Sequence, residues 1–356
     1  MKKRDFIRLL SLGAAGITAG SPLLKSCDSS RREPLAPYWV WMSARDTADV
    51  NWQGRFSQLA DLGVRGILIQ SSEEGYRELG PLAKSAGLEI HAWIIALNHR
   101  NKETLEAHPE WYTVSREGKS TALHPPYVEY YSWLCPTRKE VREFVSDRVT
   151  RLTLIEELDG IHLDYIRHSD VILPVGLWSK YNLVQDKEYP EFDFCYCDVC
   201  RTTFGEMEGI DPQDLEEPFA NQAWLQFRYD SVTKLVNELA VITSQHNKKL
   251  TAAVFPTPEI ARKLVRQEWT KWNLDAIFPM IYHNFYEEDI SWIETATREG
   301  VQALNGKFPL YSGLYIPALS HGNIAEAVEF ALAGGAAGIT FFREGIMNRR
   351  FWSKIT

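Results

Sequence analysis

A short unit recurs along this chain: a helix-like stretch ends, a small residue follows, and an apolar run begins. Copies of the unit occupy residues 62–69, 158–163, 274–280 and 334–342. Four more apolar runs occupy residues 38–43, 89–97, 250–255 and 308–316. A small residue permits a tight turn and close packing of a helix on a sheet. Continuous apolar runs are typical of parallel strands that are covered on both faces. The chain is therefore expected to form eight parallel strands.

Helical patterns fill most of the gaps between these runs. Apolar side chains fall on one helical face at Val141, Val145 and Val149, and again at Val232 and Val236. Eight strands that alternate with helices predict an α/β protein, a single-domain (β/α)8 TIM barrel over residues 38–356. An open, doubly wound sheet is the alternative, but no glycine-rich dinucleotide or phosphate-binding fingerprint supports it.

Two connections are long. Residues 99–137 follow the third strand, and residues 169–222 form an insertion after the fourth. Long loops in a compact domain are usually functional. Loops that follow the strands of a barrel lie on its catalytic face. Both are expected to wall a cleft.

The first 27 residues are expected to be a signal peptide, because a basic start precedes a short, modestly apolar run. Residues 3–8 resemble a twin-arginine export motif with Lys3 in place of the first arginine, and residues 24–27 resemble a lipobox. These resemblances imply lipidation of Cys27 and a polar tether at residues 28–37. The expected location is the periplasm, or the outer membrane or cell surface, with the membrane contacted through a lipid anchor.

The charge and the aromatic content of the chain indicate which kind of molecule it binds. A net charge of -8 without a basic patch argues against nucleic acid. The chain is rich in aromatic residues, with 12 Trp and 15 Tyr. Their flat apolar faces and polar tips suit sugar rings as well as protein cores.

Four cysteines, Cys135, Cys195, Cys197 and Cys200, lie within the predicted barrel. Outside the cytoplasm they could form disulfides. The Cys-x-Cys-x2-Cys cluster is also compatible with zinc if Cys135 comes close. A redox or catalytic role is a third alternative. We expect no cofactor, and no metal among the catalytic residues.

The fourth predicted strand carries the strongest functional signal. Ile161 and Leu163 alternate with His162 and Asp164, and polar side chains follow at the end of the strand. The carboxyl ends of the strands are where α/β barrels hold their chemistry. Asp164 is thus the first catalytic candidate, although it could simply order the following loop.

The strand ends should meet at one mouth, so their polar side chains are considered together. Paired carboxylates among aromatic platforms suit glycoside hydrolysis. Glu268 and Glu259 are the candidate partners of Asp164, although Glu259 could occupy the first turn of a helix and Glu268 a helix surface. The candidate sugar-binding residues are Trp41, His91, Trp93, Asn98, Trp111, His162, Tyr165, Arg167, Tyr282, His283, Arg343 and Glu344. The histidines could instead be hydrogen-bonded groups of the barrel interior, and Trp93 a core residue.

Three segments resemble the glycosyl-hydrolase-like family 10, a family of bacterial barrel proteins that are often lipoproteins. They are Asp-Gly-Ile-His-Leu-Asp-Tyr-Ile-Arg at 159–167, Phe-Pro-Met-Ile-Tyr at 278–282 and His-Pro-Glu-Trp at 108–111. Residues 160–164 are also similar to a strand of the α-amylase clan in which the aspartate is the nucleophile, and Asn98-His99 is similar to that clan's third strand. The resemblance implies that Asp164 is the nucleophile or central carboxylate. His162 stands where the clan has arginine, and the acid/base has no clean match.

The resulting expectation is a glycoside hydrolase that acts on an oligo- or polysaccharide. One alternative is a carbohydrate-binding surface protein without catalysis. Another is a metal-dependent barrel hydrolase or lyase that binds its metal at His162, Asp164 or His283.

Overall fold

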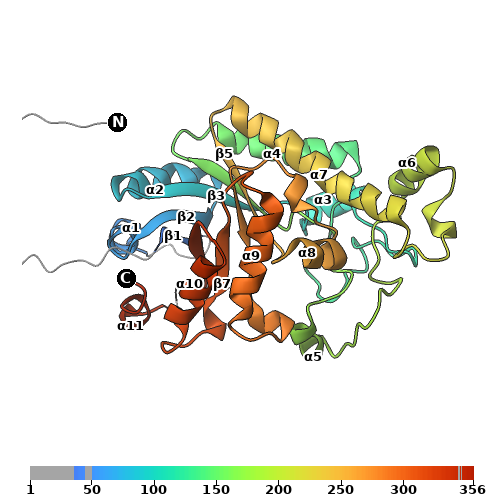
Figure 1. Cartoon of the computed structure of the whole chain (residues 1–356). Coiled ribbons are helices and arrows are strands. Elements are labelled where there is room, and N and C mark those ends of the chain that lie inside the picture. Colours follow the sequence, from blue (N-terminus) through green and yellow to red (C-terminus); the bar gives the residue numbers. More distant parts are fainter. Residues whose placement is uncertain (1–35, 45–49, 344, 346) are drawn as a thin grey trace, which may run out of the picture. The chain divides into compact units, whose positions relative to one another are not determined.

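The computed structural model describes residues 36–44, 50–343, 345 and 347–356, and it contains the eight predicted parallel strands (Figure 1). Their bounds are β1 Tyr38–Ser43, β2 Val64–Gln70, β3 Glu89–Ile95, β4 Gly160–Asp164, β5 Lys249–Val254, β6 Ala276–Pro279, β7 Tyr311–Tyr315 and β8 Gly338–Phe342. The predicted signal peptide, the tether up to residue 35, and Cys27 lie outside the described residues. In the described part of the chain, no helix is long and apolar enough to cross a membrane.

The sheet closes into a barrel. Its strand order is β6-β5-β4-β3-β2-β1-β8-β7, and parallel bridges from Ile277 to Leu310 and from Met280 to Gly313 join β6 to β7. The amide of Ile281 donates to the carbonyl of Gly313 across the same seam, at 2.9 Å. This closure confirms the predicted (β/α)8 barrel and excludes the open, doubly wound sheet.

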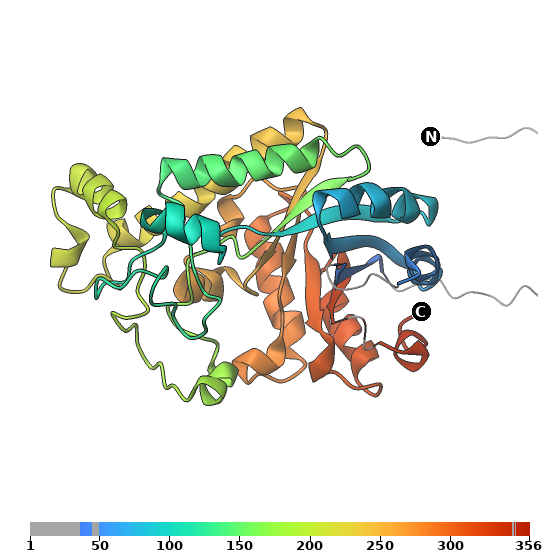
Figure 2. The same ribbon diagram turned by 180° about the vertical axis from the view of Figure 1, so that it is seen from behind.

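Helices surround the strands (Figures 1 and 2). The helices that follow successive strands are α1 Trp52–Asp61, α2 Glu73–Ser85, α4 Lys139–Thr153, α7 Gln222–Gln245, α8 Pro258–Val265, α9 Trp292–Leu304, α10 Ile324–Ala333 and α11 Arg349–Trp352. The predicted faces are confirmed, since Val141, Val145 and Val149 of α4 and Val232 and Val236 of α7 are buried. Helices α4 and α7 pack side by side on the barrel.

Strand alternation produces two cores. Side chains such as Ile161 and Leu163 point outward and are buried against the helices. The alternate side chains of the strands point into the barrel, where Trp39, Trp41, Leu68 and Phe278 belong to a separate, largely aromatic cluster. The inside of the barrel is thus a packed core, as in other barrels of this size.

The recurrent small residues serve this inner core as well as the turns. Gly63 adopts a positive φ of 87°, as a tight turn into β2 requires. A Cβ on Gly66 would lie 2.4 Å from the ring of Trp39, and one on Gly160 would lie 2.7 Å from that of His91. Glycine at these strand positions therefore makes room for large rings inside the barrel.

The two long loops extend from the carboxyl ends of β3 and β4, as predicted. Residues 96–138 contain α3 Lys102–Ala107 and the short η1 Pro109–Trp111. Residues 165–221 contain η2 Val175–Leu177, α5 Trp178–Tyr181, α6 Asp198–Glu208 and η3 Pro212–Asp214. Figure 1 shows α3, α5 and α6 on the same side of the barrel. The remaining short helices are η4 Trp269–Lys271, η5 His283–Tyr286 and η6 Ile316–Ala318.

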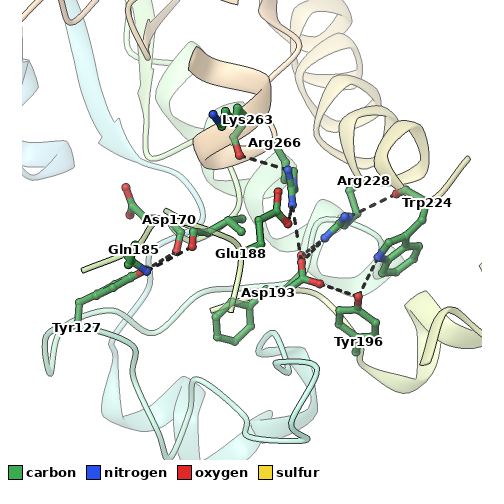
Figure 3. A network of polar contacts seen from close by, with 12 residues as sticks. Tyr127, Asp170, Gln185, Glu188, Asp193, Tyr196, Trp224, Arg228, Lys263 and Arg266 are labelled. Atoms are coloured by element: carbon green, nitrogen blue, oxygen red, sulfur yellow. Dashed lines mark hydrogen bonds and ion pairs between the residues drawn. The ribbon is translucent and has the colours of Figure 1, made fainter. Parts of the chain in front are cut away.

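A buried ionic network fastens the second loop to the barrel helices (Figure 3). Asp193 pairs with Arg228 of α7 and lies 3.9 Å from Arg266, which itself pairs with Glu188. The hydroxyl of Tyr196 donates to the second carboxylate oxygen of Asp193 at 2.6 Å. Burial alone would raise the pKa of Asp193, but the two guanidinium groups lower it below its ordinary value. Asp193 is therefore held ionised at the centre of the network.

Replacement of Asp193 by alanine should lower the free energy of unfolding by about 3–5 kcal/mol, because it leaves the buried charge of Arg228 without its partner. Equilibrium unfolding in urea measures the change. Because the pKa of Asp193 is lowered on folding, its contribution is present at neutral pH and disappears as the pH falls through that lowered value.

The matched control is Asp211→Ala, which breaks an Asp–Arg pair of the same loop with Arg201, at 2.5 Å on the surface. Surface pairs contribute little, so this variant should lose no more than about 1 kcal/mol. Equal losses in both variants would show that the buried network does not anchor the loop.

Candidate active site

A cavity of about 360 Å³ lies at the carboxyl ends of the barrel strands. Its size is within the usual range of small-molecule sites, and most of its lining is aromatic or aliphatic. The strands and the segments directly after them contribute Trp41, Trp93, Asp164, Tyr165, Arg167, Met280, Tyr282 and Phe342. The two long loops contribute Tyr131, Asp170, Leu173 and Tyr181. The strand ends and long loops therefore form one shared pocket.

Asp164 is the last residue of β4 and is 8% exposed. One carboxylate oxygen accepts a hydrogen bond from Trp93 Nε1 at 3.0 Å, and the other accepts one from the amide of Tyr165 at 2.7 Å. Tyr165 has a φ of 52°, so the chain turns sharply directly after the acid. Burial raises the pKa of Asp164, and these two hydrogen bonds reduce the shift without cancelling it.

A second carboxylate, Asp170, lines the same cavity and is 2% exposed. It accepts a hydrogen bond from Arg167 Nη1 at 3.0 Å. The guanidinium of Arg167 lies over the rings of Trp133, at 4.7 Å, and Phe255, at 5.0 Å. The pair is therefore held in one place by hydrogen bonding and by aromatic packing.

The sequence prediction missed Asp170. The available signal was its spacing of three residues from Arg167, immediately after the strand that carries Asp164. The side chain enters the cavity because the insertion folds back over the mouth. Tyr127 of the other long loop donates its hydroxyl to the Asp170 carbonyl at 3.0 Å, and Gln185 donates to that hydroxyl at 2.7 Å (Figure 3).

Aromatic side chains form the walls around the two acids. Tyr282 stacks on Phe342 with ring centroids 5.9 Å apart and planes 7° apart. Tyr131 and Tyr165, one from each long loop, meet edge to face at 6.4 Å. Such flat faces can stack on sugar rings. Of the candidate sugar-binding residues, Trp41, Trp93, Tyr165, Arg167 and Tyr282 line this cavity.

His162 and His91 lie below the cavity, inside the barrel, and are not among its lining residues. Trp41 Nε1 donates to His162 Nε2 at 2.9 Å. An indole can only donate, so His162 must carry its proton on Nδ1, which faces Thr251 Oγ1 at 2.9 Å. Burial lowers the pKa of His162 well below its ordinary value and keeps the ring neutral. His162 therefore positions Trp41, which itself lines the cavity.

His91 continues this series of hydrogen bonds toward the opposite end of the barrel. Its Nδ1 lies 3.1 Å from Thr251 Oγ1, and its Nε2 lies 2.8 Å from a carboxylate oxygen of Glu89. Burial opposes ionisation of Glu89, but His91 and Lys249 lower its pKa to about 2. His91 thus lies at the amino end of the strands, where barrels carry stability rather than catalysis.

The two glutamates expected to partner Asp164 lie elsewhere. Glu268 accepts a hydrogen bond from Gln226 of α7 at 3.0 Å and pairs with Lys271 at 2.8 Å, so its carboxylate is engaged outside the cavity. Glu259 is exposed in the first turn of α8 and faces an adjoining hollow of about 890 Å³. Neither glutamate lines the cavity that contains Asp164, because Glu259 belongs to α8 and Glu268 to the segment after it.

Four other candidates also lie apart from the cavity lining, and one falls outside the described residues. Asn98 accepts from the Ser132 amide at 3.1 Å and so braces the first long loop. Trp111 stacks on His108 at 4.0 Å, and His283 is half-buried. Arg343 borders a neighbouring hollow of about 570 Å³ that shares Trp41 and Trp93 with the cavity. Glu344 is outside the described residues.

The cavity is therefore the middle of a longer depression. The hollow beside Arg343 shares Trp41, Gln70, Trp93 and Phe342 with it. The hollow beside Glu259 shares Leu173, Pro174 and Tyr286 with it. An extended ligand could pass from one hollow to the other across the two carboxylates.

In the described part of the chain, three or more potential metal ligands come together only in the cluster of Cys135, Cys195, Cys197 and Cys200. That cluster does not line the cavity. The donor arrangement around Asp164, His162 and His283 thus gives no support to a metal centre there.

Several solved structures share the fold at low sequence identity. The glycoside hydrolase domain of PgaB (BpsB) from Bordetella bronchiseptica aligns with 90% of this chain and 96% of its own, with 12% identity and a TM-score of 0.65. A β-galactosidase from the haloarchaeon Halorubrum lacusprofundi aligns with 90% of this chain, with 13% identity and a TM-score of 0.64. A β-galactosidase from Marinomonas ef1 aligns with 90% of this chain, with 11% identity and a TM-score of 0.61.

This chain spans only 57% and 58% of those two galactosidases. At such identities the likeness shows the fold alone. None of the curated proteins matches the chain.

The family comparison is more specific. The model of the family described as "Glycosyl hydrolase-like 10" matches residues 39–328, which include both long loops and both cavity carboxylates. This match confirms the resemblance inferred from residues 108–111, 159–167 and 278–282. The chain belongs to the glycosyl hydrolase-like 10 family.

Proposed function

We propose that this protein is a glycoside hydrolase that acts on an oligo- or polysaccharide, with Asp164 as its central carboxylate. One observation carries the proposal: two buried carboxylates, Asp164 and Asp170, line one aromatic cavity at the barrel mouth. Glycoside hydrolysis uses such a pair, one acid to protonate the leaving oxygen and one carboxylate to attack or to activate water. In this proposal Asp170, and not Glu268 or Glu259, is the second carboxylate of the pair.

The two environments support different roles. Burial raises the pKa of Asp164, which favours the protonated form that a general acid needs. Asp170 instead accepts a charge-assisted hydrogen bond from the guanidinium of Arg167, and a cationic neighbour of this kind suits a nucleophile or base. This assignment differs from the α-amylase-like role of nucleophile for Asp164, and it follows from the charges around each group.

The shape supports an extended substrate. Hollows adjoin the cavity on both sides, and aromatic side chains line all three. Stacked tyrosine and tryptophan faces bind the apolar faces of sugar rings. The structural neighbours include a glycoside hydrolase domain and galactosidases, so galactosides belong in any substrate panel.

We also propose that the protein is exported and anchored to a membrane by lipid at Cys27. The basic start, the short apolar run and the lipobox-like residues 24–27 support this location. Either location would give the cleft access to glycans outside the cytoplasm. Metabolic labelling with an alkynyl fatty acid tests the anchor, since Cys27→Ser should abolish the label.

Conversion of Asp164 to asparagine should lower kcat by about 10²–10⁴-fold, because the amide keeps the shape of the side chain but cannot transfer the proton. The assay measures reducing ends released from labelled polysaccharides and chromogenic galactosides. The first step is to identify a substrate that the wild type cleaves.

The matched control is Asp159→Asn, the same chemical change one residue before β4 begins. Asp159 accepts from the amide of Ile90 at 2.8 Å at the opposite end of the barrel, so this variant should keep its activity. Full activity in Asp164→Asn would refute the assignment. Binding of glycans by the wild type without any cleavage would instead favour the non-catalytic carbohydrate-binding alternative.

The Asp164→Asn variant should be at least as stable as the wild type at neutral pH. The raised pKa means that folding disfavours the ionised form of Asp164, so the wild type loses stability as the pH rises through that pKa. The neutral amide avoids this cost and its oxygen can still accept from Trp93, although its NH2 group cannot accept from the amide of Tyr165, which reduces the gain. We expect a Tm higher by roughly 1–3 °C at pH 7 and little difference at pH 4, measured by calorimetry. A lower Tm at pH 7 would show that the carboxylate is structural.

The pH profile tests the assignment of roles. If Asp164 is the general acid, kcat/KM should fall as the pH rises above its raised pKa, which places this alkaline limb higher than an ordinary aspartate would. The substitution His283→Gln should leave the limb in place, because His283 does not line the cavity. A limb that shifts in His283→Gln, or a kcat/KM that continues to rise, contradicts the assignment.

A further inference from the structure

Four cysteines from the two long loops meet at one point. Cys135 closes the first loop just before α4, while Cys195 and Cys197 precede α6 and Cys200 lies in its first turn. All four are buried, with at most 3% exposure. Their sulfur atoms lie within 4.8 Å of one another, although 60 residues of sequence separate Cys135 from Cys195. Tertiary folding thus supplies the fourth sulfur that the Cys-x-Cys-x2-Cys run lacks.

The spacing of the sulfurs fits a tetrahedral ion. Cys135 Sγ lies 3.5 Å from Cys200 Sγ and 3.7 Å from Cys197 Sγ. With Zn–S bonds of about 2.3 Å, the edges of a tetrahedral tetrathiolate are about 3.8 Å long. A disulfide joins each sulfur to a single partner at about 2.05 Å. Here Cys135 faces two partners at the longer spacing, which favours a shared ion over a pair of bridges.

The surroundings suit thiolates. The amides of Val114 and Cys197 point at Cys195 Sγ, at 3.5 and 3.4 Å. Cys197 and Cys200 lie at the amino end of the 11-residue helix α6, where the helix dipole favours negative charge. The guanidinium of Arg138 is nearly buried beside the cluster, paired with Asp198, and its Nε has no hydrogen-bond partner. Its positive charge would offset part of the negative charge of a zinc tetrathiolate.

We propose that Cys135, Cys195, Cys197 and Cys200 bind one Zn²⁺ in a closed structural site. Four protein ligands leave no open position, so the ion has no direct part in hydrolysis. Its effect is to join the two long loops. Tyr131 of the cavity wall lies four residues before Cys135, and Asp193 of the buried network lies two residues before Cys195. The proposal does not depend on the proposed glycosidase activity.

The first test measures metal in the full chain purified without chelators. Mass spectrometry of the wild type should find one zinc per chain. Cys27→Ser, which changes the fifth cysteine, should keep that zinc and serves as the matched control. Cys197→Ser should reduce the zinc content to below about half. Replacement of the zinc by Co²⁺ should produce the absorption bands of tetrahedral thiolate cobalt.

The alternatives give distinct results. Two disulfides would leave no zinc, no free thiols among the four cysteines after denaturation, and a mass lower by four hydrogens. Four reactive thiols without metal would mean four free cysteines, and stoichiometric iron would mean a different centre. Each of these results overturns the proposal. If Cys197→Ser does not fold, the metal content and thiol count of the wild type and of Cys27→Ser still decide the matter.

Discussion

The closure of the barrel between β6 and β7 is the constraint on which the rest of the structure depends. Two isolated bridges complete the ring, and every strand then presents its carboxyl end to the same mouth. Closure also turns every second side chain inward. The interior must therefore be filled, and it is filled by tryptophans and phenylalanine with glycines opposite them. The polar chain from Trp41 through His162 and Thr251 to His91 runs within this packing. It positions Trp41 and leaves the histidines no freedom to act as proton carriers at the mouth.

At the mouth of the barrel, burial of Asp164 disfavours the charged form of its carboxylate. Asp164 is almost fully enclosed, and burial raises its pKa, so the site favours a protonated acid at some cost to stability in the ionised state. Six residues later, Asp170 is buried still more deeply but is paired with Arg167, whose guanidinium lies over aromatic rings. The two carboxylates of one short segment thus have different surroundings, with an indole and a backbone amide at Asp164 and a guanidinium at Asp170. Such a difference is the usual physical basis for dividing acid and base roles in one site.

The two long loops decide what the mouth becomes, and buried interactions hold them there. The network around Asp193 fastens the insertion to α7 and to the segment after α8 (Figure 3). The cysteine cluster brings the same insertion against the loop after β3, and the proposed zinc would join the two. The cavity wall includes residues from both loops, so its shape depends on how the loops are held as well as on the barrel. A fold shared with distant hydrolases at 11–13% identity can in this way carry a site of its own.

The sequence by itself determined the eight strands, the buried faces of α4 and α7, the glycine before β2 and the glycine that begins β4, and the position of Asp164 at a strand end. These features follow from local rules, since side chains alternate along a strand and repeat every three to four residues along a helix. Only the tertiary structure decided which groups share the cavity. Asp170 lines the same cavity as Asp164, whereas Glu268 is engaged by Gln226 and Lys271 and Glu259 is exposed. Trp111 and Asn98 take part in loop packing, and Cys135 lies close to the other three cysteines. The physical reason is that these neighbours come from loops whose paths depend on contacts between residues far apart in the chain, and no local pattern encodes such contacts.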